Sequence, residues 1–369
     1  MTVVIAGGGP TGLAAAIQAR LAGLEVIVID AKTPPIDKAC GEGLMPSGVE
    51  ALRSLGIQEL EFVPFRGIRY VQEDRPDSSI AEGLFGAGEG WGIRRLELHN
   101  ALVQRAEELG ASLRWGVRVT GLEEGGLMTS DGLIEGDWII GADGLNSSIR
   151  KWAGLEGKPT KIRRYGLRRH YSRPAWSDRV EVYWADGCEA YVTPTSPDTI
   201  GVAILWDRER HKPSPSDPLA PFPSLKKHLG EAPFASISRG AGPLHRATSA
   251  VQNGRIFLIG DAAGYVDAIT GEGLALGLNQ AKAAIDCILH RRPKSYSKQY
   301  RSLTKHSFFI TRMVRWLSFH SPFRRRFIQG LSGDPALFGT GLDVMDGNQS
   351  LWRLGPLRCL RLLGRMLRS

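Results

Sequence analysis

Cysteines are few in this sequence and long apolar runs are absent, and both facts narrow what the chain can be. The four cysteines lie far apart without a CxxC pair, which argues against a zinc site and is typical of reduced thiols in the cytoplasm. No stretch approaches the roughly 18 apolar residues of a membrane-spanning helix. The opening residues MTVVIAGGGP predict a strand entering a glycine turn rather than a secretory signal.

Acidic residues are scarce in the last fifth of the chain. Residues 291–369 contain 16 Lys and Arg against 3 Asp, a net charge of +13 within a whole-chain charge of +9, so residues 1–290 carry −4. The segment LWRLGPLRCLRLLGRMLRS spaces leucines three or four apart with arginines between them, which predicts an amphipathic helix. Such a helix either caps a neighbouring domain or makes a peripheral contact with the inner face of a membrane. A nucleic-acid partner is not expected, because no recognition module accompanies the charge.

The first thirty residues predict a dinucleotide site. TVVIAGGGPTGLAAAIQARLAGLEVIVID is a strand, a glycine turn, a helix and a second strand. Gly7, Gly9 and Gly12 form G-x-G-x-x-G, which makes the tight turn, admits a pyrophosphate and lets helix pack on strand. Thr11 lies in the same turn, at a helix start that favours phosphate. Asp30 ends the second strand, where it is placed to accept hydrogen bonds from a ribose.

Two later segments indicate FAD rather than NAD. In GDWIIGADGLNSSIR an apolar strand is followed by Asp143, and in IFLIGDAAGYVDAITGEGLALGL a strand is followed by Asp261. Ligands bind at the carboxyl ends of parallel strands in open α/β sheets, so Asp261 is placed to bind a ribityl hydroxyl. Gly271 and Gly273 precede a helix whose positive end would face the flavin, where negative charge develops on reduction.

Together these motifs resemble the FAD-dependent oxidoreductases of the para-hydroxybenzoate hydroxylase type, over residues 1 to about 290. GDAAG followed by TGEG is similar to the geranylgeranyl reductase branch. The segment PPIDKACG matches that branch's P-x-x-x-K-x-C-G motif at Pro34, Lys38, Cys40 and Gly41. The resemblance implies that Ala39, Cys40 and Gly41 lie along the flavin. Cys40 would then tune the flavin or shape the substrate cavity, unless it is a small packing residue.

The resemblance implies three further site residues. Arg95 is a candidate for the FAD phosphates or ribityl chain, although a surface charge is the alternative. A backbone group near Val119 would meet the adenine, and Tyr191 would contact the substrate. The isolated histidines are interpreted as structural, and they are His99, His170 and His245. We predict no metal site.

The substrate motif of the branch is only partly present. Residues 189–203, EAYVTPTSPDTIGVA, keep Tyr191, Pro194 and Gly201 of the Tyr-x-Trp-x-Phe-Pro…Gly-x-Gly pattern but lack its Trp and Phe. The expected substrate is therefore a lipophilic small molecule that is bulky and apolar, whether isoprenoid, polyketide or quinone-like.

The expected fold is α/β, with a Rossmann-like FAD-binding domain, an α+β substrate domain built on a second sheet, and a helical tail. The FAD-binding domain is predicted to be discontinuous and to comprise residues 1–60, 94–155 and 245–290. The substrate domain comprises residues 61–93 and 156–244, and the basic helical region residues 291–369.

Two flavin chemistries stay open at this stage. A reductase passes hydride from flavin N5 to a double bond, whereas a monooxygenase uses O₂ to form a C4a-hydroperoxide that hydroxylates its substrate. The CGEG and TGEG loops favour the reductase. A second GxGxxG is absent, so NAD(P)H would bind transiently or a reductase partner would deliver electrons. An alternative of another class is an inactive FAD-binding accessory protein.

Overall fold

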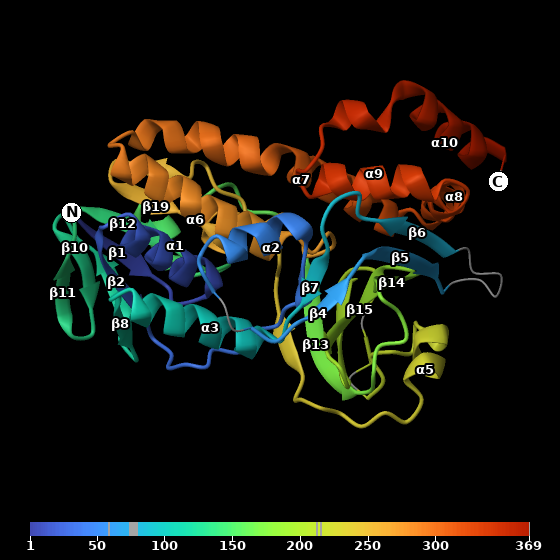
Figure 1. Cartoon of the computed structure of the whole chain (residues 1–369), viewed down its shortest axis with the longest axis horizontal. Coiled ribbons are helices and arrows are strands. Elements are labelled where there is room, and N and C mark those ends of the chain that lie inside the picture. The colour runs from blue at the N-terminus through green and yellow to red at the C-terminus, as the bar shows by residue number, and fades with distance from the viewer. Residues whose placement is uncertain (58–59, 74–79, 212, 215, 369) are drawn as a thin grey trace.

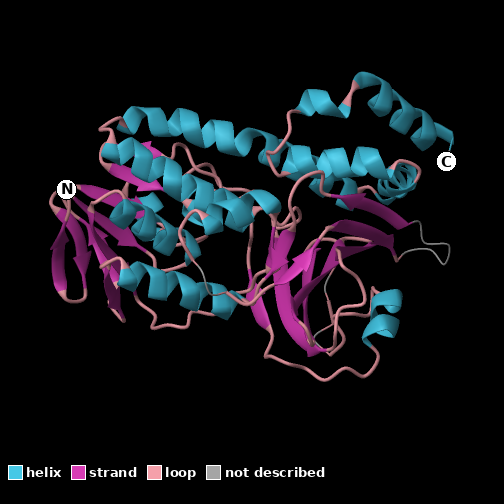
Figure 2. Cartoon of the chain, viewed as in Figure 1, coloured by secondary structure: helices cyan, strands magenta, loops and turns pink. Residues whose placement is uncertain are grey.

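Two large β-sheets occupy separate parts of the molecule, and long helices run along one side of both (Figures 1 and 2). The computed structural model describes residues 1–57, 60–73, 80–211, 213–214 and 216–368. No helix within these ranges combines the length and apolarity needed to cross a bilayer. The predicted α/β fold with a second sheet and a helical C-terminal region is confirmed.

The first sheet has six strands and a mostly parallel order. In sheet order the strands are β18 (Gln252–Asn253), β19 (Ile256–Leu258), β12 (Trp138–Gly141), β1 (Thr2–Ala6), β2 (Glu25–Asp30) and β8 (Ser112–Trp115). The helices around it are α1 (Pro10–Leu21), α3 (Arg95–Glu108), α4 (Ser148–Trp152) and α6 (Gly273–Leu289). Its central strand is fully buried from Val3 to Ile5, because helices cover a parallel sheet on both faces. A smaller antiparallel sheet of β9 (Val119–Leu122), β10 (Gly126–Thr129) and β11 (Gly132–Glu135) flanks it.

The second sheet has seven strands and is antiparallel except where β5 meets β14. In sheet order the strands are β17 (Arg239–Ala241), β13 (Arg164–Ser172), β16 (Thr199–Asp207), β15 (Cys188–Ser196), β14 (Val180–Ala185), β5 (Gly67–Gln72) and β6 (Ile80–Leu84). One face packs on Phe222 and Leu225 of the segment that forms α5 (Pro223–Leu229). The other face contributes to the apolar cluster that includes Phe338 and Leu342 of the C-terminal helices.

A three-stranded sheet joins these two parts. It consists of β3 (Gly43–Leu44), β7 (Gly90–Gly92) and β4 (Val63–Phe65), and α2 (Pro46–Arg53) follows β3. A Cβ at Gly92 would lie 1.7 Å from the carbonyl oxygen of Pro194 in β15. This close approach of two backbones requires glycine and brings the loop before β3 against the second sheet.

The basic C-terminal region is helical, as predicted. It forms α7 (Tyr296–Phe319), α8 (Ser321–Ser332), α9 (Pro335–Met345) and α10 (Pro356–Arg368), with short 3₁₀ turns η2 (Pro293–Ser295) and η3 (Leu351–Leu354). In Figure 1 α7 runs over the first part of the molecule and α8 to α10 over the edge of the second sheet near β6. The exact division of the chain into domains stays a prediction, although β18, β19 and α6 do complete the first sheet and its cover.

Candidate functional site

A cavity of about 630 Å³ is lined by residues of both large sheets. This volume lies within the roughly 300–1,000 Å³ of small-molecule sites. The described lining includes most of the predicted site residues, namely Gly7, Gly9, Thr11, Asp30, Ala39, Cys40, Gly41, Arg95, Asp143, Tyr191, Asp261, Gly271 and Gly273. Segments separated by more than 260 residues in the chain therefore meet at one place.

The glycine turn at the start of α1 leaves no room for a side chain at Gly7 or Gly12. A Cβ at Gly12 would lie 1.9 Å from the carbonyl oxygen of Gly7, and a Cβ at Gly7 would lie 2.4 Å from that of Ala142. Gly7 also has a φ of +111°, which favours glycine. No side chain caps α1 at Gly9, so the backbone N–H groups of its first turn are left for a ligand.

Two buried polar atoms beside this turn have no hydrogen-bond partner within the described residues: Arg95 Nη1 and Asp143 Oδ1. Arg95 is 6% exposed, and burial lowers the pKa of its guanidinium. Its Nη2 lies 4.0 Å from the position of a Cβ on Gly9. Asp143 Oδ2 accepts the backbone N–H groups of Ser148 at 2.7 Å and Ile149 at 3.2 Å, which leaves Oδ1 open. The unpaired guanidinium N–H of Arg95 beside the glycine turn suits a phosphate group. The open carboxylate oxygen of Asp143 suits a hydroxyl group, which can donate a hydrogen bond to it.

Glu42, in the loop before β3, is fixed from several directions. Its φ of +58° is a left-handed conformation that costs roughly 1–2 kcal/mol in a residue with a Cβ. Oε1 accepts the backbone N–H of Arg95 at 2.8 Å, and Oε2 lies 2.5 Å from His170 Nε2 in β13. Gly201 of β16 pairs with His170 of β13, and a Cβ at Gly201 would lie 3.1 Å from Oε2. The pair of Glu42 and His170 therefore joins the cavity loop to the second sheet.

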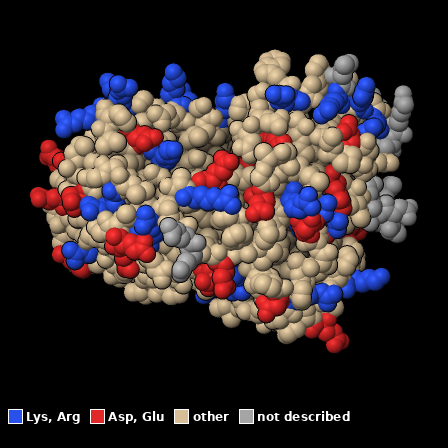
Figure 3. All heavy atoms as spheres, in the orientation of Figure 1, with Lys and Arg blue, Asp and Glu red and all other residues tan. Residues whose placement is uncertain are grey.

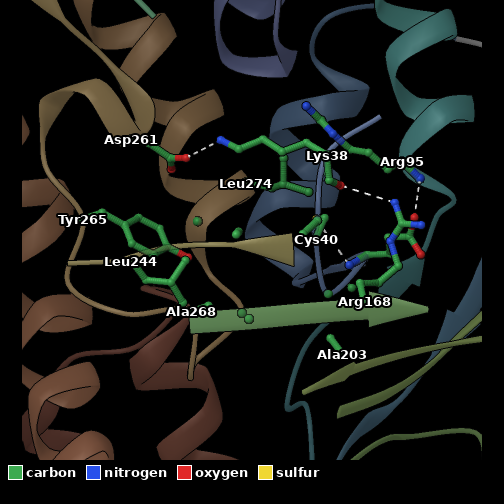
Figure 4. Close-up of a pocket in the computed structure, with 18 of the residues that line it drawn as sticks. Lys38, Cys40, Arg95, Arg168, Ala203, Leu244, Asp261, Tyr265, Ala268 and Leu274 are labelled. Atoms are coloured by element: carbon green, nitrogen blue, oxygen red, sulfur yellow. Dashed lines mark hydrogen bonds and ion pairs between the residues drawn. The ribbon is translucent and has the colours of Figure 1, made fainter. Parts of the chain in front are cut away.

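Asp37 attaches the same loop at a second point. Its carboxylate accepts hydrogen bonds from Arg168 in β13 and, at 3.0 Å, from Arg239 Nε in β17. Burial raises the pKa of Asp37, but the two guanidinium groups outweigh it and the net shift is downward. Lys38 extends across the cavity and its Nζ lies 2.9 Å from Asp261 Oδ2 (Figure 4).

The Cys40 side chain lies in the cavity between these attachments (Figure 4). Its Sγ accepts the backbone N–H of Glu42 at 3.4 Å. Burial raises the pKa of the thiol, and nearby Arg95 only partly opposes this. Cys40 is therefore a neutral thiol at neutral pH, which suits shaping of the cavity better than nucleophilic attack. A direct chemical role for Cys40 stays a prediction.

Comparison with known proteins decides the family. The model of the FAD binding domain family matches residues 1–290. The chain belongs to this FAD-binding family. A menaquinone reductase of Mycobacterium tuberculosis is 30% identical over 320 residues, covering 78% of this chain and 76% of that protein. A digeranylgeranylglycerophospholipid reductase of Methanosarcina acetivorans is 27% identical, covering 85% and 83%. A flavoprotein/dehydrogenase structure from Cytophaga hutchinsonii has a TM-score of 0.85 at 18% identity over the whole of both chains, which shows the same fold.

The chain is thus an FAD-dependent oxidoreductase, and the residues at the cavity fit that cofactor. The glycine turn, the start of α1 and Arg95 would hold the phosphates, and Asp30, Asp143 and Asp261 offer carboxylate acceptors for hydroxyl groups. Both oxygens of Asp30 already accept backbone N–H groups, from Gly8 and Lys32, so a ribose would use their remaining lone pairs. These assignments stay predictions for each residue.

Two predicted residues do not line the cavity. Gly12 packs α1 against Gly7 and Ala142, the residues directly after β1 and β12, and Val119 begins β9 on the flanking sheet. Sequence reasoning also missed the contacts of Glu42 and His170, because it treated His170 as an isolated structural residue. The signal available was the glutamate within CGEG, whose position between two glycines indicates an unusual loop.

Glu272 is a further buried acid, at the cap of α6 between the cavity-lining Gly271 and Gly273. It accepts a hydrogen bond from Ser307 Oγ of α7 at 2.6 Å. Burial raises the pKa of this carboxyl to about 8, against the opposing effect of Ser307 and Thr270. Glu272 is therefore mostly protonated at neutral pH. Its carboxyl group then adds no negative charge that would neutralise the positive N-terminal end of the α6 dipole.

We expect Glu272→Gln to flatten the dependence of stability on pH. The folded carboxyl keeps its proton to about pH 8, whereas the unfolded one releases it near pH 4.5. The free energy of unfolding of the parent chain should therefore fall as pH rises through this window, by up to about 1.4 kcal/mol per pH unit. Glutamine removes this slope. Urea unfolding at pH 5 to 9 measures the slope, and Glu107→Gln on the exposed face of α3 is the control. If the free energies of unfolding of Glu272→Gln and the parent chain changed with pH in parallel, Glu272 would not be the buried acid that causes the slope.

Proposed function

We propose that this chain reduces a carbon–carbon double bond of a bulky lipophilic substrate, with FAD as the hydride source. The observation that supports the proposal is the shared cavity, in which the glycine turn and Arg95 lie at one end and apolar side chains of the second sheet at the other. The two reductases described above are named for menaquinone and a digeranylgeranyl lipid, both of which are lipophilic.

The protein's own part in this reaction is binding, orientation and exclusion of water. FAD, when bound, supplies the two-electron chemistry. Asp37 and Glu42 hold the cavity loop on the second sheet through Arg168 and His170. Burial keeps the Cys40 thiol neutral and raises the pKa of Glu272 at the cap of α6 to about 8, so neither side chain carries a full negative charge at neutral pH. Such preorganised surroundings are what an enzyme contributes to cofactor chemistry.

Anaerobic stopped-flow reduction tests the proposal. The FAD-loaded protein is reduced with NADPH, with NADH or with dithionite, and then mixed with a prenylated quinone, with geranylgeraniol or with O₂. We expect fast reoxidation by a prenylated compound, with a saturated product found by mass spectrometry, and slow reoxidation by O₂. Fast O₂ consumption coupled to hydroxylated product would instead identify a monooxygenase. No reoxidation by either lipophile, or no reduction by any donor, would favour the inactive accessory protein.

We further propose that the C-terminal region contacts an anionic membrane surface, from which such a substrate would come. Trp352 in η3 is 90% exposed and Leu360 in α10 is 62% exposed. Exposed arginines accompany them, and Figure 3 shows Lys and Arg gathered over this part of the molecule with few acidic side chains. Aromatic and basic groups together suit the headgroup region of a bilayer. Leu362 faces inward to α8 at Gly330, so α10 also packs on the protein.

We expect the triple change Arg353→Gln, Arg358→Gln and Arg361→Gln to weaken binding to phosphatidylglycerol vesicles about 100-fold. Each cation near an anionic surface contributes about 1 kcal/mol. Vesicle sedimentation measures the change, and neutral phosphatidylcholine vesicles should show weak binding throughout. The charge-matched control replaces three exposed lysines elsewhere, Lys158, Lys161 and Lys227. Equal losses of vesicle binding in both triple variants would mean that the net charge of the protein, and not the position of these three arginines, determines the binding.

A further inference from the structure

The end of the cavity formed by the second sheet is apolar. Its walls come from β5, β14 and β16, from the segment after β17, from the loop before α6 and from α9. The residues are Ile68, Val180, Val182, Leu205, Leu244, Ala268, Ile269 and Met345. Most of these residues belong to one hydrophobic cluster with Tyr70, Tyr191 and Tyr265. A substrate in this end therefore meets hydrocarbon and aromatic surface on most sides.

The two guanidinium groups of the described cavity lining lie away from this apolar end. The lysines and arginines of that lining are Lys32, Lys38, Arg95 and Arg168. Lys38 is paired with Asp261 and Arg168 with Asp37. Figure 4 shows Arg95 and Arg168 on the side of the cavity opposite Leu244, Ala268 and Tyr265. Lys38 does reach toward Tyr265 (Figure 4), but its ammonium is already paired with Asp261. A phosphate group in the apolar end would therefore have no unpaired lysine or arginine of the described lining beside it, and burying an unpaired anion is costly.

Two tyrosine hydroxyls in this end are available to a ligand. Tyr70 and Tyr265 both line the cavity, and within the described residues neither hydroxyl has a hydrogen-bond partner. The ring of Tyr70 is held edge-on by Trp184, with centroids 5.4 Å apart, and contacts Phe338. Burial raises the pKa of both phenols, so each keeps its proton and acts as a donor.

Tyr191 differs from these two tyrosines. Its hydroxyl donates to the carbonyl oxygen of Ile269 at 2.7 Å, so its hydrogen is already used within the protein. Tyr191 was the substrate residue predicted from the sequence, and it contributes its ring to the cavity wall. Among the tyrosines that line the cavity, Tyr70 and Tyr265 therefore keep a donor for a substrate oxygen, and the sequence did not single them out.

We propose that the apolar end binds a neutral ring bearing carbonyl groups, such as a quinone, and that Tyr265 and Tyr70 donate hydrogen bonds to its oxygens. An apolar pocket with a few placed neutral donors is the arrangement that orients a carbonyl compound. The assignment rests on the proposed function and deepens it, because it selects a quinone-like substrate over a lipid whose phosphate headgroup enters the cavity. Tyr70 and Tyr265 are then the residues that determine specificity.

Binding to the FAD-loaded, oxidised protein tests this assignment without turnover. The probes are 2-methyl-1,4-naphthoquinone and 2-methylnaphthalene, which share a ring system and differ in the carbonyl oxygens. Quenching of tryptophan fluorescence gives both dissociation constants. We expect Tyr265→Phe and Tyr70→Phe each to raise the ratio of the quinone constant to the hydrocarbon constant by about 2- to 10-fold, which corresponds to one lost hydrogen bond.

Tyr171→Phe is the matched control, because Tyr171 belongs to the cluster on the opposite face of the second sheet and does not line the cavity, and its ratio should equal that of the parent. Flavin absorbance and melting temperature establish that each variant is folded and loaded. An unchanged ratio in both Tyr265→Phe and Tyr70→Phe would overturn the proposal. Competition provides a second test: geranylgeranyl phosphate displacing the quinone better than geranylgeraniol does would also overturn it. These binding measurements do not depend on turnover, so they can be interpreted even if the reductase assay shows no activity. Failure of the proposed quinone site can therefore be distinguished from failure of the proposed reductase function.

Discussion

Replacing Arg164 with methionine is expected to lower the free energy of unfolding by about 3–5 kcal/mol, because it leaves buried carboxylates without their cation. Arg164 is fully buried at the start of β13. Its Nη2 lies 2.8 Å from Glu189 Oε2 in β15, and its Nε lies 3.0 Å from Asp267 Oδ2 in the loop before α6. Burial lowers the pKa of the guanidinium, but the two carboxylates outweigh this and raise it. The cluster connects the second sheet to the loop that carries Asp261 and Gly271.

The loss of stability in Arg164→Met should come from charge, because the change leaves two carboxylates in a fully buried site without their cation. Urea unfolding of the variant and the parent chain measures this loss. The triple change Arg164→Met, Glu189→Gln and Asp267→Asn removes all three charges and should recover most of the loss. A triple variant as unstable as Arg164→Met would show that volume, not charge, determines the effect.

Gly12→Ala is expected to raise the dissociation constant for FAD at least about 100-fold. The added Cβ would lie 1.9 Å from the carbonyl oxygen of Gly7 and 3.3 Å from Ala142 Cβ. Both contacts are with groups of the sheet and turn, so relief requires α1 to move away from β1. That movement displaces the first turn of α1 and the phosphate site beside Arg95. Titration of the FAD-free protein with FAD, followed by flavin fluorescence, measures the change.

Gly341→Ala is the matched control for this experiment. Gly341 lies in α9, and a Cβ there would meet nothing within 4 Å. Alanine is favoured over glycine in helices by about 1 kcal/mol, so this variant should bind FAD like the parent and unfold no more easily. Gly12→Ala protein that binds FAD within threefold of the parent would exclude the close packing at the turn as a requirement for the site.

The local parts of the FAD site could be predicted because they lie in short continuous segments. A glycine turn, the strand before it and the helix after it are specified by residues close in sequence, since tight turns and close backbone approach require glycine. The same holds for Asp143 and Asp261, each of which follows an apolar strand. These residues do line one cavity, as expected for the carboxyl ends of neighbouring parallel strands. The basic amphipathic end of the chain also forms its predicted helix, from Pro356 to Arg368.

Only the tertiary structure decided how these segments meet the second sheet. Nothing in the periodicity of β13 indicates that His170 contacts Glu42, or that Arg168 contacts Asp37, because the partners are about 130 residues apart. The same holds for Arg164 and Asp267, and for the choice of which tyrosine hydroxyls face the cavity and which are used internally. The sequence by itself determined the cofactor and the family, since these depend on local backbone shape. The loop's attachment, the buried charge cluster and the available donors depend on long-range packing, which no local pattern encodes.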